Sequence, residues 1–123
     1  MKSKLRYLLG AVVVILILTL VGCGKSQIFG DKITGDNLTS IKEILSNPSK
    51  FEGKTVKVEG KIVLECTTGC WFNLEDKSGG IFIELNGSGF AIPQKVGSSA
   101  IVEGKVETSN GRTMIIAKGV EIK

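Results

Sequence analysis

The stretch Val58-Glu59-Gly60-Lys61-Ile62 recurs later in the chain as Val102-Glu103-Gly104-Lys105-Val106. In both copies apolar and charged residues alternate, and the glycine falls on the apolar side. A period of two is typical of a strand with one buried and one exposed face. An inward glycine lets such a strand bend sharply or approach another backbone closely. The repeated stretch therefore predicts two long strands that bend within one curved sheet.

Three further strands follow from the same period, and turn residues separate them. The five predicted strands cover residues 55–65, 70–74, 81–85, 100–107 and 113–122. In the first strand the alternation predicts inward positions at Val56, Val58, Gly60, Ile62 and Leu64. Asn110-Gly111 favours a tight hairpin turn before the last strand. Gly119 indicates a bulge, which leaves the inward positions of that strand undecided.

Five strands with inward glycines in the first and the fourth resemble the OB-fold, a partly open Greek-key barrel. The resemblance spans residues 53–123 and implies an all-β fold, a five-stranded OB-like Greek-key barrel. The chain departs from the usual pattern between the third and fourth strands. Residues 86–99 are rich in glycine and contain Pro93 instead of a helical period, so we expect no helix there.

Ser40-Ile41-Lys42-Glu43 has the Ser-x-x-Glu form of a capping box, which predicts the start of a short N-terminal helix. Ile41, Ile44 and Leu45 follow at helical spacing, and Pro48 ends the helix. A helix of under two turns is not stable alone. We therefore expect it to dock the edge formed by these three apolar residues on the barrel.

The N-terminus has the layout of a signal peptide, with a basic start, an uncharged apolar run over residues 7–20 and a site of small residues. The basic residues are Lys2, Lys4 and Arg6. Leu20-Val21-Gly22-Cys23 resembles the bacterial lipobox. The resemblance implies cleavage before Cys23 and transfer of a diacylglyceryl group to its sulfur.

The alternative is an uncleaved membrane-spanning anchor over residues 7–24, and either arrangement places the rest of the chain outside the cytoplasm. An acylated Cys23 would carry two or three chains, enough for stable attachment. We therefore expect a signal peptide at 1–22, the lipidated cysteine and a tether at 23–38, and the OB-like domain at 39–123. The expected location is extracytoplasmic and lipid-anchored, on an inner or an outer membrane.

Composition excludes several functions. Three of the 16 basic residues lie in the leader, so 13 basic residues face 12 acidic ones in the rest, which is nearly neutral. Neutralising a phosphate backbone takes a surplus of Lys and Arg, so we do not expect nucleic acid as a partner. Histidine is absent, which removes the usual general base and the commonest metal ligand. It also excludes the role of the membrane-anchored OB-fold haem chaperones, which attach haem through a histidine.

Cys66 and Cys70 flank a three-residue loop in which Gly69 occupies the place that a left-handed conformation favours. Directly opposed residues of an antiparallel hairpin lie within the range that a disulfide accepts. Outside the cytoplasm oxidation is the expected state, so we predict a disulfide that staples one hairpin.

The alternative is a reduced pair that binds Cu(I) or Zn(II) or performs redox chemistry. Zinc needs four ligands, and the predicted domain has no histidine and no cysteine besides Cys66 and Cys70 to complete the set. The spacing is also one residue longer than in thioredoxin-type sites. We therefore expect no metal and no cofactor. In the alternative, Cys66 and Cys70 are the thiol pair that binds the metal or performs the redox chemistry.

Cys66-Thr67-Thr68-Gly69-Cys70-Trp71 also resembles a Cys-x-x-Gly-Cys-Trp signature of small exported bacterial OB-like proteins of uncharacterised function. The resemblance implies the fold and the location, and it implies no activity.

A ligand face is predicted on the second and third strands, which commonly bind ligands in OB barrels. Parity places Trp71, Asn73, Phe82 and Glu84 outward, together with Glu75. Aromatic rings there can stack on bases or sugars, but two carboxylates repel a phosphate backbone. Oligosaccharide, peptide or a partner protein therefore suits this face better than DNA. The alternative is that the tether or the short helix covers the aromatic pair.

The sequence gives no support for catalysis. Glu75-Asp76 has the look of a carboxylate pair, but Asp76 precedes a turn over residues 77–80 and is expected to shape it by a side-chain hydrogen bond. We therefore predict a membrane-anchored extracytoplasmic binding or accessory module, and no enzyme. A thiol-based metal or redox protein is the first alternative, and a nucleic-acid-binding OB module is the second.

Overall fold

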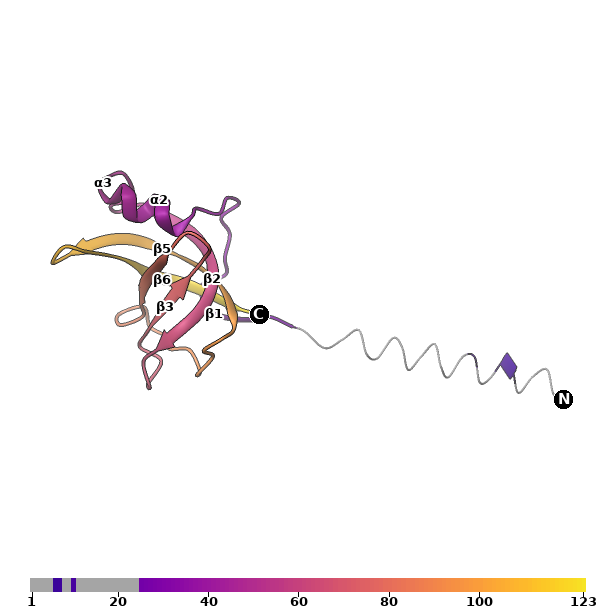
Figure 1. Ribbon diagram of the computed structural model, residues 1–123. Helices are drawn as coiled ribbons and strands as arrows, with labels where there is room; N and C mark the ends of the chain where they lie inside the picture. Colours follow the sequence, from indigo (N-terminus) through magenta and orange to yellow (C-terminus); the bar gives the residue numbers. More distant parts are fainter. Residues whose placement is uncertain (1–5, 8–9, 11–24) are drawn as a thin grey trace.

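Five strands close into a barrel in the computed structural model, which describes residues 6–7, 10 and 25–123 (Figure 1). They are β2 (Thr55–Glu65), β3 (Trp71–Glu75), β4 (Gly80–Glu84), β5 (Ser99–Ser109) and β6 (Arg112–Ile122). Their order around the barrel is β6-β4-β3-β2-β5, and β5 pairs with β6 to close it. All neighbours are antiparallel except β4 and β6, which run parallel. The predicted five-stranded OB-like barrel is confirmed.

A sixth strand, β1 (Gln27–Gly30), pairs antiparallel with the end of β6 and was not predicted. Phe29 of β1 packs against the core, and the amide of Gly35 donates to a carboxylate oxygen of Glu103 at 2.7 Å. The expected tether over residues 23–38 is therefore corrected, because its part from Gln27 onward belongs to the domain. A four-residue strand with one apolar contact carries no recognisable period.

The two repeated glycines, Gly60 and Gly104, lie where the backbones of neighbouring strands approach closely, as predicted. A Cβ atom added at Gly60 would lie 2.3 Å from the carbonyl oxygen of Glu75. At Gly104 the same atom would lie 2.3 Å from the carbonyl oxygen of Ile116. Any larger residue would push the two backbones apart, so these glycines let β2 and β5 wrap closely around the barrel.

A bulge at Val63 changes the expected parity of β2. The register with β3 shifts between Ile62 and Leu64, so Leu64 turns outward and is 53% exposed. Glu65 takes the inward place and is 9% exposed, and one of its carboxylate oxygens accepts from the amide of Lys95 at 2.9 Å. The prediction of Leu64 as a core residue was wrong, because an extra residue in one strand reverses every later side chain.

The predicted turn and bulge near the C-terminus are both present. Asn110 and Gly111 have φ angles of 51° and 75°, as a tight hairpin turn between β5 and β6 requires. The register between these strands shifts where Glu103 pairs with Gly119 and Gly104 with Ala117. The extra residue of this bulge is Lys118.

The short helix α2 (Ile41–Ser46) begins as predicted, because the Ser40 hydroxyl accepts from the amide of Glu43. Ile41 and Ile44 are buried, but Leu45 is 41% exposed and does not dock with them. Pro48 ends α2 and also begins a second helix, α3 (Pro48–Phe51), which was not predicted. A proline fits this first helical position because an amide proton there would have no partner within the helix.

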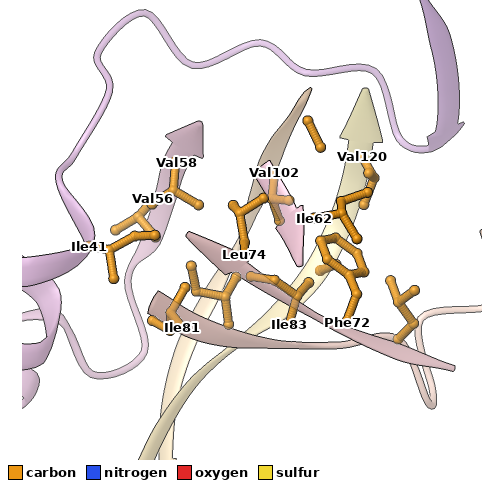
Figure 2. Packing of buried hydrophobic residues seen from close by; sticks show 14 of the residues in the cluster. Ile41, Val56, Val58, Ile62, Phe72, Leu74, Ile81, Ile83, Val102 and Val120 are labelled. Carbon is orange, nitrogen blue, oxygen red and sulfur yellow. The ribbon is translucent and has the colours of Figure 1, made fainter. Parts of the chain in front are cut away.

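The core lies inside the barrel, where inward side chains of all five strands meet (Figure 2). Phe72, Leu74, Ile83, Val102 and Ile115 are among its fully buried members. Ile41 and Ile44 extend the core beneath α2, at one end of the barrel.

Residues 1–5, 8–9 and 11–24 lie outside the described part of the chain, so the predicted signal peptide and Cys23 are not represented. Within the described residues, no helix is both long enough and apolar enough to span a membrane.

Candidate functional site

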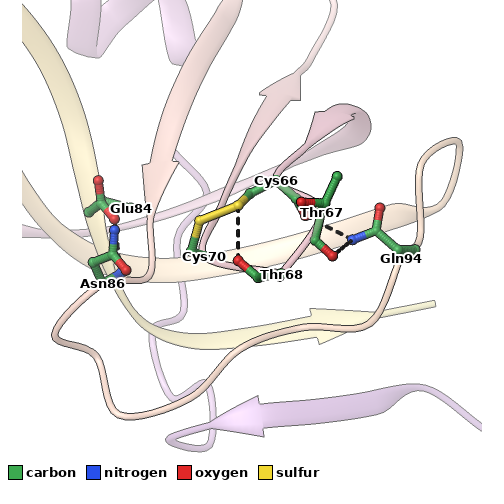
Figure 3. Close-up of a disulfide and its surroundings, with 7 residues drawn as sticks. All are labelled: Cys66, Thr67, Thr68, Cys70, Glu84, Asn86 and Gln94. Carbon is green, nitrogen blue, oxygen red and sulfur yellow. Dashed lines mark hydrogen bonds between the residues drawn. A yellow bond between two sulfur atoms is a disulfide. The ribbon is translucent and has the colours of Figure 1, made fainter.

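The hairpin between β2 and β3 is closed by a disulfide between Cys66 and Cys70, with 5.6 Å between their Cα atoms (Figure 3). Gly69 has a φ angle of 73°, the left-handed conformation expected at the end of a three-residue loop. Its amide donates to the Cys66 carbonyl at 2.9 Å, and the Cys66 amide donates to the Trp71 carbonyl at 3.0 Å. The predicted staple is confirmed.

The stapled hairpin also holds the long connection between β4 and β5. The side-chain amide of Gln94 donates to the carbonyls of Cys66 and Thr67 at 2.8 and 3.3 Å (Figure 3). A Cβ atom at Gly69 would lie 2.1 Å from the carbonyl oxygen of Ile92, so the two backbones touch. Residues 86–98 contain no helix, as expected, and Ile92 is buried in the core.

In the disulfide neither sulfur is a thiolate, so metal binding at Cys66 and Cys70 would first require reduction. The part of the chain that the structure describes contains no group of three or more cysteine or carboxylate side chains arranged to hold a metal ion.

The four predicted face residues come together on the outer side of β3 and β4. Trp71 lies opposite Glu84 and Asn73 opposite Phe82 in the antiparallel pair, and all four side chains are half-buried. The rings of Trp71 and Phe82 stack with centroids 5.3 Å apart and an interplanar angle of 29°. Glu84 accepts from the amide of Asn86 at 2.9 Å, so it also orders the start of the following loop.

Arg112 joins this stack and was missed by the sequence analysis. Its guanidinium carbon lies 4.7 Å from the centroid of the Phe82 ring. Strands β3 and β6 flank β4 on opposite sides, so Trp71 and Arg112 approach Phe82 from opposite sides. Phe82 is therefore in contact with a neighbouring side chain on the β3 side and on the β6 side. Arg112 precedes the predicted strand over residues 113–122, whose inward positions were undecided, so no alternation indicated it.

A groove of about 460 Å³ crosses the outer surface beside this stack. Its lining includes Leu45, Val63, Asn73, Glu75, Phe82 and Arg112. Asn73 and Phe82 belong to the predicted face, whereas Trp71 and Glu84 lie outside the groove lining. The volume falls within the range of small-ligand sites.

The two segments that could have covered the aromatic pair, the N-terminal segment and the short helix, lie mostly away from it. Strand β1 pairs with residues 119–122 of β6, away from the positions that stack, and α2 contributes only Leu45 to the groove. Leu45, Val63 and Leu64 leave apolar surface exposed along this side of the barrel.

The groove carries one cation and one carboxylate on opposite sides of β4. Among the described residues two ion pairs form, Lys50 with Glu43 and Lys123 with Glu59, and neither Arg112 nor Glu75 takes part in one. Arg112 therefore keeps its donors available for an anionic group.

Asp76, next to the groove, is a structural carboxylate. It accepts from the amides of Ser78 and Gly79, which confirms its predicted role in the turn, and from the amide of Ile41 at 2.9 Å. Partial burial raises the pKa of Asp76, but hydrogen bonds from Ser78, Ile41 and Gly79 outweigh it and hold the pKa below its ordinary value. This residue ties α2 to the β3–β4 hairpin and so positions Leu45 at the groove.

Comparison with known proteins identifies the fold and no family. No family model and no curated protein matches the sequence. Among solved structures the chain is similar to the hypothetical protein ygiW from E. coli, with a TM-score of 0.57 and 17% sequence identity. The match covers 77% of this chain and 99% of that one. At this identity the likeness shows a shared barrel fold only.

Proposed function

We propose that this protein is a lipid-anchored, extracytoplasmic binding or accessory module whose ligand occupies the outer groove beside Phe82. The observation that carries the proposal is the groove itself, in which exposed apolar side chains, an amide and a guanidinium without an ion pair among the described residues meet on one face. The attachment and the location follow from the lipobox resemblance at Cys23.

Binding suits this groove better than catalysis. Its ionisable side chains are Glu75 and Arg112, and a guanidinium does not exchange protons near neutral pH. The chain also has no histidine that could act as a general base. Asp76, the nearest second carboxylate, is committed to the turn and to α2.

The ligand we favour is a peptide or protein segment rather than a sugar or a nucleic acid. Sugars and bases commonly bind through the open face of an aromatic ring, and Phe82, the ring in the groove lining, is already stacked on Trp71 and contacted by Arg112. Glu75 and Glu84 on the same side of the barrel disfavour a phosphate backbone.

The proposal is tested by photocrosslinking in cells that export the protein. A photoreactive phenylalanine analogue replaces Leu64, which borders the groove at the Asn73 position, or Ile28 on β1 as a matched control. The two residues are 53% and 52% exposed, so they differ in place and not in accessibility. We expect a defined adduct from position 64 alone. Equal adducts from both positions, or none from position 64, would contradict the proposal.

A further inference from the structure

The groove lies where the pairing of β4 with β6 stops. The parallel ladder joins residues 82–84 of β4 to residues 114–116 of β6. The first two residues of each strand, Gly80 with Ile81 and Arg112 with Thr113, lie beyond the residues that this ladder pairs, and all four line the groove. The sheet is therefore open at this corner of the barrel.

The backbone of Gly80 faces this opening. The amide of Asp76 donates to the carbonyl of Gly79 at 3.0 Å, which makes these two a hydrogen-bonded pair. Hydrogen-bonded and non-hydrogen-bonded pairs alternate along an antiparallel hairpin, so Glu75 and Gly80 form a non-hydrogen-bonded pair. The amide and carbonyl of Gly80 then point away from β3, toward the β6 side. Unpaired backbone groups at a sheet edge are a template for another extended chain.

Arg112 adds a charge-specific contact at the same place. The Phe82 ring holds its guanidinium in position, and no described carboxylate pairs with it. A guanidinium fixed in this way binds a carboxylate through two parallel hydrogen bonds. Glu75, across β4 from Arg112, would repel an acidic group on that side, so an acid is favoured only near β6.

We infer that the groove binds an extended peptide segment of a partner protein by adding it to the free edge at Gly80. An acidic side chain of the peptide binds Arg112 on β6, and an apolar side chain packs against Leu45 of α2, the helix that contacts β4. Strand addition of this kind draws affinity from the main chain and specificity from alternate side chains. The inference rests on the proposed function and names the ligand class of the same groove.

The test uses the full-length chain in detergent micelles and a phage library of random twelve-residue peptides. Wild type, Arg112→Glu and Lys105→Glu are compared, the last being an exposed lysine on β5 outside the groove. We expect wild type and Lys105→Glu to select peptides with Asp or Glu beside an apolar residue, and Arg112→Glu to select Lys or Arg instead. The affinity of Arg112→Glu for the peptides selected by wild type should fall about ten- to a hundredfold, because hydrogen bonds between the guanidinium and the acidic side chain are lost.

Backbone pairing is tested on the selected peptide by methylating its amide nitrogens one at a time. Addition at Gly80 predicts that methylation of the one peptide nitrogen that donates to the Gly80 carbonyl reduces affinity about tenfold or more, while the two neighbouring nitrogens tolerate it. No enrichment, selection that ignores Arg112→Glu, or tolerance at every nitrogen would overturn the inference. If the crosslink from position 64 then still captures a ligand that is not a peptide, the proposed function stands and only the ligand class fails.

Discussion

Replacing Gly104 with alanine tests the barrel geometry at a position where the backbones of β5 and β6 approach closely. The new Cβ atom would lie 2.3 Å from the Ile116 carbonyl oxygen, 2.8 Å from the Ile115 Cγ2 atom and 2.9 Å from the Ala117 Cα atom. Ordinary contacts begin near 3.4 Å, so β6 would have to retreat by about 1 Å. Two of these atoms belong to the backbone, which cannot rotate out of the way as a side chain can.

The expected loss is about 2 kcal/mol in the free energy of unfolding. Overpacking typically costs about 1 to 3 kcal/mol, and here the backbone on one side leaves little room for relaxation. Glycine to alanine would otherwise stabilise by about 0.4 to 1 kcal/mol through the unfolded chain. The φ angle at Gly104 lies outside the left-handed region, so backbone strain adds nothing. For a domain of this size the loss corresponds to a fall of roughly 10 °C in Tm.

Urea denaturation of wild type and Gly104→Ala measures this difference, with Gly79→Ala as the control. A Cβ atom at Gly79 would meet only the Ile41 Cγ2 atom, at 3.8 Å, so that variant should stay within about 0.5 kcal/mol of wild type. Gly60→Ala should behave like Gly104→Ala, since it faces the Glu75 carbonyl in the same way. A Gly104→Ala protein as stable as wild type would refute the close approach of β5 and β6.

Three further predictions concern single contacts. Replacing both Cys66 and Cys70 with serine should lower the free energy of unfolding by about 2 kcal/mol, the entropy of so small a loop, and an unchanged urea midpoint would contradict this. Trp71→Ala should lower the free energy of unfolding by about 2 kcal/mol, because it removes a half-buried ring and its aromatic contact. Phe72→Ala should lower it by about 3 to 5 kcal/mol, because it leaves a cavity in the core. Equal losses in urea melts would argue against the opposite orientation of these two neighbours. Because the pKa of Asp76 is lowered on folding, its stabilisation should be full above its ordinary value of 3.8 and disappear as the pH falls through the folded-state pKa. Asp76→Asn should lack this part of the pH dependence in urea titrations between about pH 2 and 6, and a profile identical to wild type would be evidence against it.

Sequence reasoning succeeded where the signal is local. The period of two identified all five barrel strands, and Asn110-Gly111 identified their last turn. The inward glycines of β2 and β5 indicated the close approaches, because a glycine at an apolar position needs a steric reason. The capping box identified the start of α2, because the cap is formed by residues close together in the sequence.

Errors arose where pairing between distant segments decides the outcome. The parity of Leu64 depends on a bulge set by the partner strand β3, and β1 exists only because it finds the free end of β6. Arg112 reaches Phe82 through the parallel register of β4 and β6, which no local pattern encodes. The candidate face was therefore found in part, while the groove that occupies it required the structure.

Hydrogen exchange of the full chain, measured before and after incubation with the envelope fraction of its own cells, tests the groove most directly. Peptide fragments that cover residues 73–84 and 110–114 should gain protection, because they hold the groove and the free edge at Gly80. Fragments that cover β1 and residues 86–98 should exchange at unchanged rates. Protection confined to β1 or to residues 86–98 would place the binding surface elsewhere and contradict the account.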